Sequence, residues 1–118
     1  IKSNVFSDSV GGNYDNNSEA TMIFGPFNIE SPDLILSFDT KYSLESSYDF
    51  GYVEISTDNG VTWKQIDKYT GVSSWTLQTY DLSEYINGAN TFKIRFKMTS
   101  DYMLVKDGWY IDNVSLLK

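Results

Sequence analysis

The sequence GWYIDNVSLL, residues 108–117, decides the fold class because it reads as a β-strand close to the end of the chain. Aromatic and β-branched residues dominate it, and both kinds are enriched in strands. Side chains alternate between the two faces of a strand, so two sets are expected. The first set is Tyr110, Asp112, Val114 and Leu116, and the second is Trp109, Ile111, Asn113 and Ser115. The stretch therefore predicts a final strand that carries one carboxylate on an otherwise apolar face.

That carboxylate, Asp112, is the unusual residue of the strand. A carboxylate among buried side chains is costly unless a cation or several hydrogen-bond donors satisfy it. No basic residue lies between Lys106 and Lys118, so the strand itself supplies no partner. Hard cations select oxygen ligands, and the pattern predicts that Asp112 binds calcium. The alternative is a carboxylate that accepts hydrogen bonds from a neighbouring loop.

Alternating segments recur along the whole chain. The clearest covers residues 91–99, where apolar side chains alternate with cations as in an amphipathic strand. The apolar set is Phe92, Ile94, Phe96 and Met98, and the cationic set is Lys93, Arg95 and Lys97. Other strands are expected at residues 20–29, 34–42, 50–56, 61–69 and 75–82, with one or two edge strands in 1–18 and a helical turn in 81–86. About eight or nine strands, spaced roughly 8–12 residues apart, predict an all-β, antiparallel two-sheet β-sandwich.

Length and charge narrow the possible roles of the chain. Its 118 residues make one domain, which buries roughly two-thirds of its unfolded surface. A net charge of −7 predicts weak binding to nucleic acid or anionic membranes, and it is compatible with divalent cations. No apolar run approaches the roughly 18 residues of a membrane span, and no signal peptide is present. Because the chain begins abruptly at Ile1, we interpret it as a fragment of a longer protein.

Most familiar catalytic chemistry is excluded by composition. The chain has no histidine and no cysteine, which excludes Ser-His-Asp and Cys-His nucleophiles and typical zinc sites. Two carboxylate pairs, Glu45 with Asp49 and Glu54 with Asp39, are nominal candidates for glycoside hydrolysis. Solvated or metal-bound acids are the better interpretation, because a small sandwich offers little concave surface for a substrate. We therefore predict that the chain is not an enzyme.

Several stretches together resemble a known family. They are YDFGYVEISTDNGVTW at residues 48–63, YDLSEY at 80–85, FKIRF at 92–96 and GWYIDNV at 108–114. In this order they resemble the MAM-like jelly-roll domain found C-terminal in immune-inhibitor-A-type secreted metalloproteases and in some subtilisin-like bacterial proteases. They are also similar to the cleaved-adhesin domains of gingipains. The resemblance covers about residues 14–117 and indicates a fold rather than a function, because such domains accompany many enzymes and adhesins.

The resemblance implies a single jelly-roll β-sandwich over residues 1–118 that is extracellular and stabilised by calcium. The family's acidic positions fall on Asp49 and Asp112, and Glu45 and Asp15 are looser matches. A calcium ion needs roughly six to eight oxygen ligands, which would converge here only in the folded domain. We therefore expect Ca²⁺ to be held by Asp112, Asp49, Glu45 and Asp15.

One hairpin resembles a different motif. STDNGVTW, residues 56–63, is similar to the Asp-box hairpin that recurs in sialidase propellers. It occurs once here, and the chain is far too short for a propeller. The local interpretation suffices, in which Asp58 caps the turn, Gly60 adopts a left-handed conformation and Trp63 packs beneath it.

The expected role is that of an accessory domain of a secreted or cell-surface bacterial protein, most simply a protease. It would pack on the catalytic domain of the same chain, or bind a substrate or a surface. One alternative is a carbohydrate-binding module, and another is an adhesin module that binds host protein. Candidates for stacking on sugar rings are Tyr42, Tyr48, Tyr52, Trp75, Tyr102 and Trp109, although large aromatics also fill sandwich cores. The apolar loop at residues 101–105 is a candidate contact with a partner, or it folds back over the core.

Overall fold

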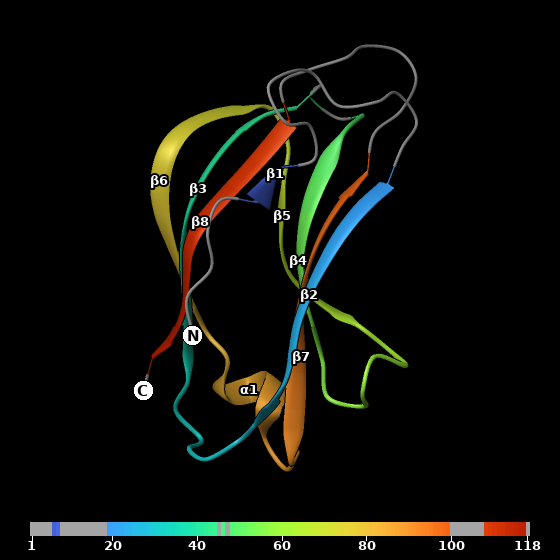
Figure 1. Cartoon of the computed structure of the whole chain (residues 1–118), viewed down its shortest axis with the longest axis vertical. Coiled ribbons are helices and arrows are strands. Elements are labelled where there is room, and N and C mark those ends of the chain that lie inside the picture. The colour runs from blue at the N-terminus through green and yellow to red at the C-terminus, as the bar shows by residue number, and fades with distance from the viewer. Residues whose placement is uncertain (1–5, 8–18, 45, 47, 100–107, 118) are drawn as a thin grey trace.

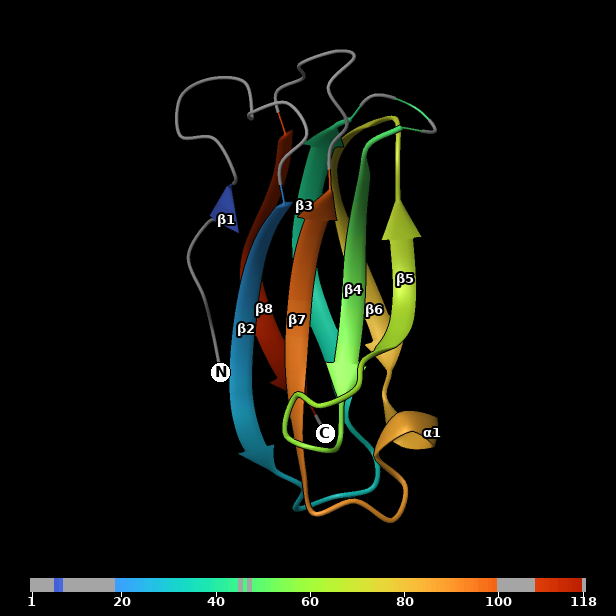
Figure 2. The same cartoon turned by 90° about the vertical axis from the view of Figure 1, so that its right-hand side faces the viewer.

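The computed structural model of the chain describes residues 6–7, 19–44, 46, 48–99 and 108–117. These residues form eight strands and one short helix, arranged as two antiparallel sheets that face each other (Figures 1 and 2). In chain order the elements are β1 (Phe6–Ser7), β2 (Glu19–Asn28), β3 (Ile35–Ser43), β4 (Phe50–Ser56), β5 (Lys64–Tyr69), β6 (Val72–Asp81), α1 (Ser83–Ile86), β7 (Thr91–Thr99) and β8 (Gly108–Leu117). The predicted all-β two-sheet sandwich is thereby confirmed.

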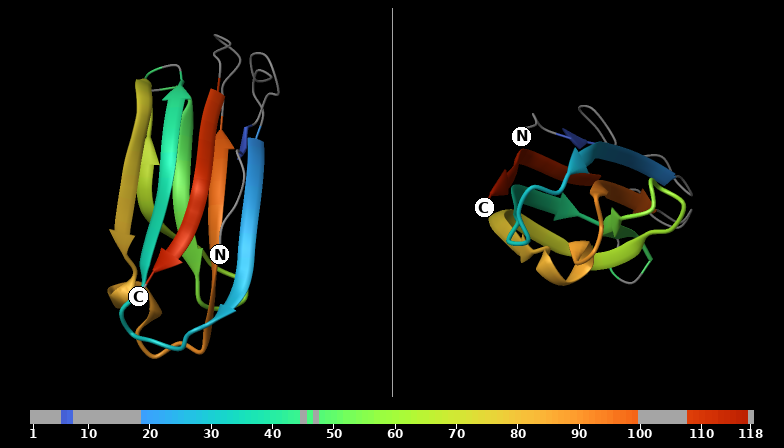
Figure 3. Two further views of the ribbon diagram at one scale, coloured as in Figure 1. Left: turned by 60° about the vertical axis from the view of Figure 1, so that its left-hand side comes forward. Right: turned by 90° about the horizontal axis from the view of Figure 1, so that it is seen from below.

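The strand order shows why neighbours in sequence do not always pair. Sheet A has the order β1-β8-β3-β6, and sheet B has the order β2-β7-β4-β5. Consecutive strands β3 and β4 therefore belong to opposite sheets, as do β5 and β6 and also β7 and β8. Seen from below, the two sheets form two layers (Figure 3). The apolar inner faces of both layers meet between them, as in a β-sandwich.

The core consists of the inward side chains of both sheets. β7 buries Phe92, Ile94, Phe96 and Met98, as its sequence pattern predicts. The ring of Phe96 contacts Phe38 of sheet A edge-to-face, with centroids 5.1 Å apart, and Trp109 of sheet A at 5.9 Å. Such edge-to-face pairs are a favoured arrangement of aromatic rings. These contacts join the centres of the two sheets.

Trp109 is the largest fully buried side chain, and two neighbours fix its position. Its indole Nε1 donates a hydrogen bond to Thr40 Oγ1 at 2.8 Å, and that hydroxyl donates to the carbonyl of Tyr110 at 2.9 Å. On the opposite sheet, Gly51 lies directly against the indole ring. A Cβ at position 51 would be 2.7 Å from Cε3 of Trp109, which is closer than real contacts allow. The glycine therefore provides the space for the ring.

Hydrogen bonds between side chains connect the two sheets at one edge of the sandwich. The hydroxyls of Tyr69 on β5 and Tyr80 on β6 are hydrogen-bonded, and Tyr80 also donates to Asp67 Oδ2 at 2.6 Å. Burial raises the pKa of Tyr69, and burial together with these hydrogen bonds raises the pKa of Tyr80. Both phenols therefore stay protonated at neutral pH and connect the edges of sheets A and B.

Candidate binding site on the outer face of sheet A

The side chain of Asp112 lies on the outer face of sheet A, not among buried residues. Trp109, Ile111 and Val114 point inward. Two residues rather than one therefore separate the inward-facing Ile111 and Val114. The cause is Asn113, which has a φ of 54°, and the β3–β8 register shifts at the same place. Asparagine tolerates this left-handed conformation better than most residues. The expectation that Asp112 shares a face with Val114 is therefore wrong, because a β-bulge separates them.

The bulge places Asp112 beside a second carboxylate. Asp112 is the register partner of Asp39 on β3. The backbone N–H of Asn113 donates to Asp112 Oδ1 at 2.8 Å, and the Asn113 side-chain amide donates to Asp39 Oδ2 at 2.9 Å. One asparagine thus holds both carboxylates on the outer face of the sheet.

The next row of the same face holds two aromatic rings and a lysine. Lys41 is the register partner of Tyr110, and Trp75 lies on the neighbouring strand β6. The Lys41 ammonium is 4.9 Å from the centre of the Tyr110 ring and 5.5 Å from that of the Trp75 ring. Both distances are within the range of cation–π attraction. Lys41 on β3 therefore lies between the rings of Tyr110 on β8 and Trp75 on β6.

Trp75 lies beside a shallow hollow. Its side chain is 47% exposed, although large apolar groups are usually covered. The hollow has a volume of about 330 Å³ and is lined by Asp39, Trp75 and Asp112. Leu77, opposite Asp39 in the register, is exposed on the same strand. The outer face of sheet A thus combines an exposed indole, acceptor oxygens and a space next to them. We call this group the Trp75 hollow.

Of the four acids expected to hold calcium, the structure describes Asp49 and Asp112. Asp49 is fully buried where the chain enters β4 of sheet B, whereas Asp112 lies on the outer face of sheet A. Glu45 and Asp15 lie outside the described residues. Among the residues that are described, no group of three or more His, Cys, Asp or Glu side chains is placed to hold a metal ion. The expected set of four ligands therefore stays a prediction, and Asp112 and Asp49 belong to different places.

The nominal catalytic pair Glu54 and Asp39 is separated as well. Glu54 lies in sheet B and forms an ion pair with Arg95 Nη2 at 2.6 Å, while Asp39 faces outward from sheet A. Two carboxylates on opposite sheets of the sandwich do not flank a common glycosidic bond. Asp49 is buried, and its proposed companion Glu45 is not among the described residues.

The five aromatic candidates that the structure describes differ in their surroundings. Trp109 is buried in the core and Tyr42 packs on Tyr69, so neither is free to bind a sugar. Tyr48 is exposed, and Tyr52 lies beneath the Lys97 ammonium on sheet B. Tyr102 and the apolar loop at 101–105 lie outside the described residues. Trp75 is the candidate that borders the hollow, and Tyr110, which is not among the six candidates, lies on the same face.

The hairpin at residues 56–63 is a local structural motif. Asp58 accepts hydrogen bonds from the hydroxyl and the backbone N–H of Thr62, and from the hydroxyl of Ser56. The bond from the Thr62 side chain is the largest of the causes that lower the Asp58 pKa to about 2. Because the pKa of Asp58 is lowered in the folded chain, the ionised carboxylate stabilises the hairpin at any pH above the usual aspartate pKa. This stabilisation is lost as the pH falls toward about 2. Gly60, at a φ of 90°, takes the expected left-handed conformation.

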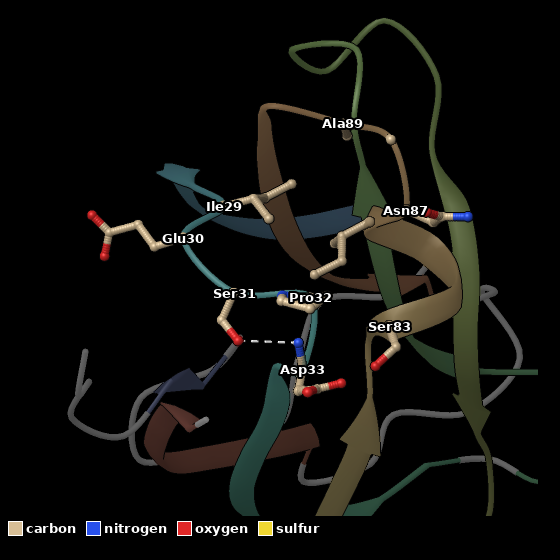
Figure 4. Close-up of a pocket in the computed structure, with 10 residues that line it drawn as sticks. Ile29, Glu30, Ser31, Pro32, Asp33, Ser83, Asn87 and Ala89 are labelled. Atoms are coloured by element: carbon tan, nitrogen blue, oxygen red, sulfur yellow. Dashed lines mark hydrogen bonds between the residues drawn. The ribbon is translucent and has the colours of Figure 1, made fainter.

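A second open hollow lies at the end of the sandwich near α1. It has a volume of about 460 Å³ and is lined by residues 29–33 and by residues of 83–89 (Figure 4). Within it, Ser31 Oγ accepts a hydrogen bond from the backbone N–H of Asp33 at 3.2 Å. The Glu30 side chain points away from the other labelled residues (Figure 4). This hollow contains no exposed aromatic ring, in contrast to the Trp75 hollow.

The fold and its outer face define a β-sandwich domain with an exposed aromatic face. No protein-family model matches the chain, so the MAM-like resemblance is not confirmed. The chain is 37% identical over 116 residues to Bacillopeptidase F of Bacillus subtilis (strain 168), a match that covers 95% of this chain and 8% of that protein. The chain thus spans a small part of this homologue. None of the described helices is long and apolar enough to span a membrane.

Among solved structures, the chain is similar to the β-sandwich TmCBM61, which was solved in complex with β-1,4-galactotriose. The TM-score is 0.55 and the sequence identity 14%, and the match covers 90% of this chain and 68% of the other. At this identity the likeness concerns the fold alone. Homology to a small region of a peptidase, on a β-sandwich fold, fits an accessory domain.

Proposed function

We propose that this chain is a non-catalytic accessory domain of a secreted bacterial peptidase and that it binds carbohydrate through the Trp75 hollow. The observation that carries the proposal is the exposed Trp75 ring beside Asp39 and Asp112. A pyranose ring has an apolar face of C–H groups that stacks on an indole, and its hydroxyls donate hydrogen bonds to carboxylates. The homology to Bacillopeptidase F supports the peptidase context. The similarity to TmCBM61 supports a fold on which a glycan site can be built.

The composition of the face favours a glycan over a protein partner. The centre of a protein–protein interface is depleted in charged residues. Here the two central strands, β3 and β8, carry the charged residues Lys41, Asp39 and Asp112. The exposed apolar residues Trp75 and Leu77 lie beside them on the edge strand β6. The hollow of about 330 Å³ is at the lower end of the roughly 300–1,000 Å³ typical of small-ligand sites. Packing on a catalytic domain and binding of host protein are the alternatives that the following test separates.

Replacing Trp75 with alanine is expected to weaken glycan binding by at least about tenfold, because an aromatic anchor is lost. The matched control is Trp63→Ala, since Trp63 also carries a cation over its ring, Arg95 at 4.3 Å, but lies outside the hollow. Affinity electrophoresis against galactan, glucan, mannan and xylan would measure binding, and circular dichroism would verify folding. If none of these neutral glycans binds, or if Trp63→Ala reduces binding as much as Trp75→Ala, the carbohydrate proposal is wrong.

We also propose that calcium stabilises the domain, with Asp49 as its buried ligand. A fully buried carboxylate requires hydrogen-bond donors or a cation around it. Asp49 is fully buried, whereas Asp112 is only partly buried. The Asp49 backbone carbonyl accepts a hydrogen bond from the Thr70 hydroxyl at 2.9 Å, which fixes the chain at this point. A bound ion would add its binding free energy to the free energy of unfolding.

Adding calcium to chelator-treated protein is expected to raise the melting temperature, by an amount that grows with calcium concentration. Asp49→Asn should remove most of that gain, because the isosteric amide keeps the volume and lacks the charge. Asp112→Asn is the control and should keep the gain. Differential scanning calorimetry would measure it. An unchanged melting temperature of the parent chain excludes the ion, and loss of the gain only in Asp112→Asn assigns the ion to the outer face of sheet A.

A further inference from the structure

The Trp75 hollow is distinctly acidic. Of the described residues, Asp39, Trp75 and Asp112 line it; two of these are carboxylates and none is a cation. Lys41 is the nearest basic residue in the register, but its ammonium lies over the rings of Tyr110 and Trp75. Within the described part of the chain, the ion pair with a nitrogen–oxygen distance below 4 Å is that of Arg95 and Glu54 on sheet B. Asp39 and Asp112 therefore form no ion pair with a described residue.

The hydrogen bonds of the two carboxylates leave acceptor capacity. A carboxylate has two oxygens and about four acceptor positions. Asn113 donates one hydrogen bond to Asp39 Oδ2 and one to Asp112 Oδ1, and within the described part of the chain this leaves Oδ1 of Asp39 and Oδ2 of Asp112 as acceptors. Hydroxyl groups are the natural donors to such oxygens, and bonds to an ionised acceptor are stronger than neutral ones. A ligand group that is itself an anion would instead be repelled.

We infer that the Trp75 hollow selects uncharged or amino-bearing sugars and rejects glycans that carry carboxylate groups. This inference rests on the proposed carbohydrate function and adds the chemical class of its ligand. Two like charges in the hollow act on a third at short range, where solvent screening is incomplete. The net charge of −7 on the whole chain acts in the same direction. The orienting groups are Asp39 and Asp112, and the stacking group is Trp75.

The test compares a neutral glycan that binds the chain with the same glycan after oxidation of its primary alcohols to carboxylates. The two polymers then share their ring structure and linkage and differ in charge. Isothermal titration calorimetry at low salt is expected to show about tenfold weaker binding to the oxidised polymer, and the difference should shrink as salt is raised. In Asp39→Asn/Asp112→Asn the two affinities should lie within about threefold, because the amides keep the shape and remove the charge.

Each outcome of this comparison has a defined meaning. Equal affinity of the parent chain for the neutral and oxidised polymers overturns the inference while the carbohydrate function stands. A tenfold preference that persists unchanged in Asp39→Asn/Asp112→Asn also overturns it, since the discrimination then comes from another group. Lys68→Met is the control variant, and it should keep the preference because Lys68 lies on sheet B, over the Phe50 ring, away from the hollow. If no neutral glycan binds the parent chain at all, the proposed function fails rather than this inference alone.

Discussion

Trp109→Ala is expected to lower the free energy of unfolding by about 3–5 kcal/mol, the range for a large aromatic removed from a core. Trp109 is fully buried, contacts Phe96 and Tyr69 through its ring, and donates a hydrogen bond to Thr40. Its loss leaves a cavity between the sheets and removes a donor from a buried hydroxyl. Urea unfolding followed by circular dichroism would measure the change.

The control for this prediction is Trp63→Ala. Trp63 is only partly buried, and the Arg95 guanidinium lies 4.3 Å above its ring. A cation–π contact at such a site contributes about 0.5–1 kcal/mol. The description of the core is contradicted if Trp109→Ala is no more destabilising than Trp63→Ala. Trp109→Phe should lie between the parent and the alanine variant, because it retains part of the ring volume.

Gly51→Ala is expected to destabilise the domain by about 1–3 kcal/mol, although it adds a single methyl group. The new Cβ would lie 2.7 Å from Cε3 and 2.9 Å from Cδ2 of Trp109. These are atoms of a rigid, enclosed ring, so either the ring or strand β4 must shift. Urea unfolding measures the cost, and amide exchange would show whether β4 is loosened.

A double-mutant cycle isolates the cause of this effect. Gly51→Ala should cost less in a Trp109→Phe background than in the parent, because the smaller ring relieves the overlap. A coupling of about 1 kcal/mol is expected for residues in direct contact. Identical costs in the two backgrounds would mean that Gly51 is required for another reason.

The fold could be predicted from sequence because most strands alternate regularly. The alternation in residues 91–99 predicts which side chains face inward, and in the structure Phe92, Ile94, Phe96 and Met98 are buried as expected. The helical turn expected at 81–86 is present as α1, and the interruption expected near Pro26 is present as a shift of register between Phe24 and Phe27 in β2. These features depend on local residue preferences, which a single sequence displays.

The candidate site could not be predicted in the same way, because it depends on the register between distant strands. Asn113 introduces a bulge because its φ is positive, but an asparagine in a strand does not by itself predict a positive φ. A strand without that bulge would place Asp112 on the same face as the buried Val114. Its pairing with Asp39 spans more than seventy residues of sequence, as the 74-residue separation of the Asn113–Asp39 hydrogen bond shows. Trp75 is one of the six aromatic candidates, yet only the arrangement of β6 at the edge of sheet A shows that its exposed ring lies beside Asp39 and Asp112.

The most direct measurement is an amide NMR titration of the chain with a neutral oligosaccharide taken from a glycan that it binds. The largest shift changes are expected on the outer face of sheet A, at Asp39, Lys41, Trp75, Tyr110 and Asp112. The indole N–H of the buried Trp109 should change little. Changes concentrated instead at residues 29–33 and 83–89, around the hollow near α1, would contradict the assignment of the binding site, as would a spectrum that no neutral sugar alters.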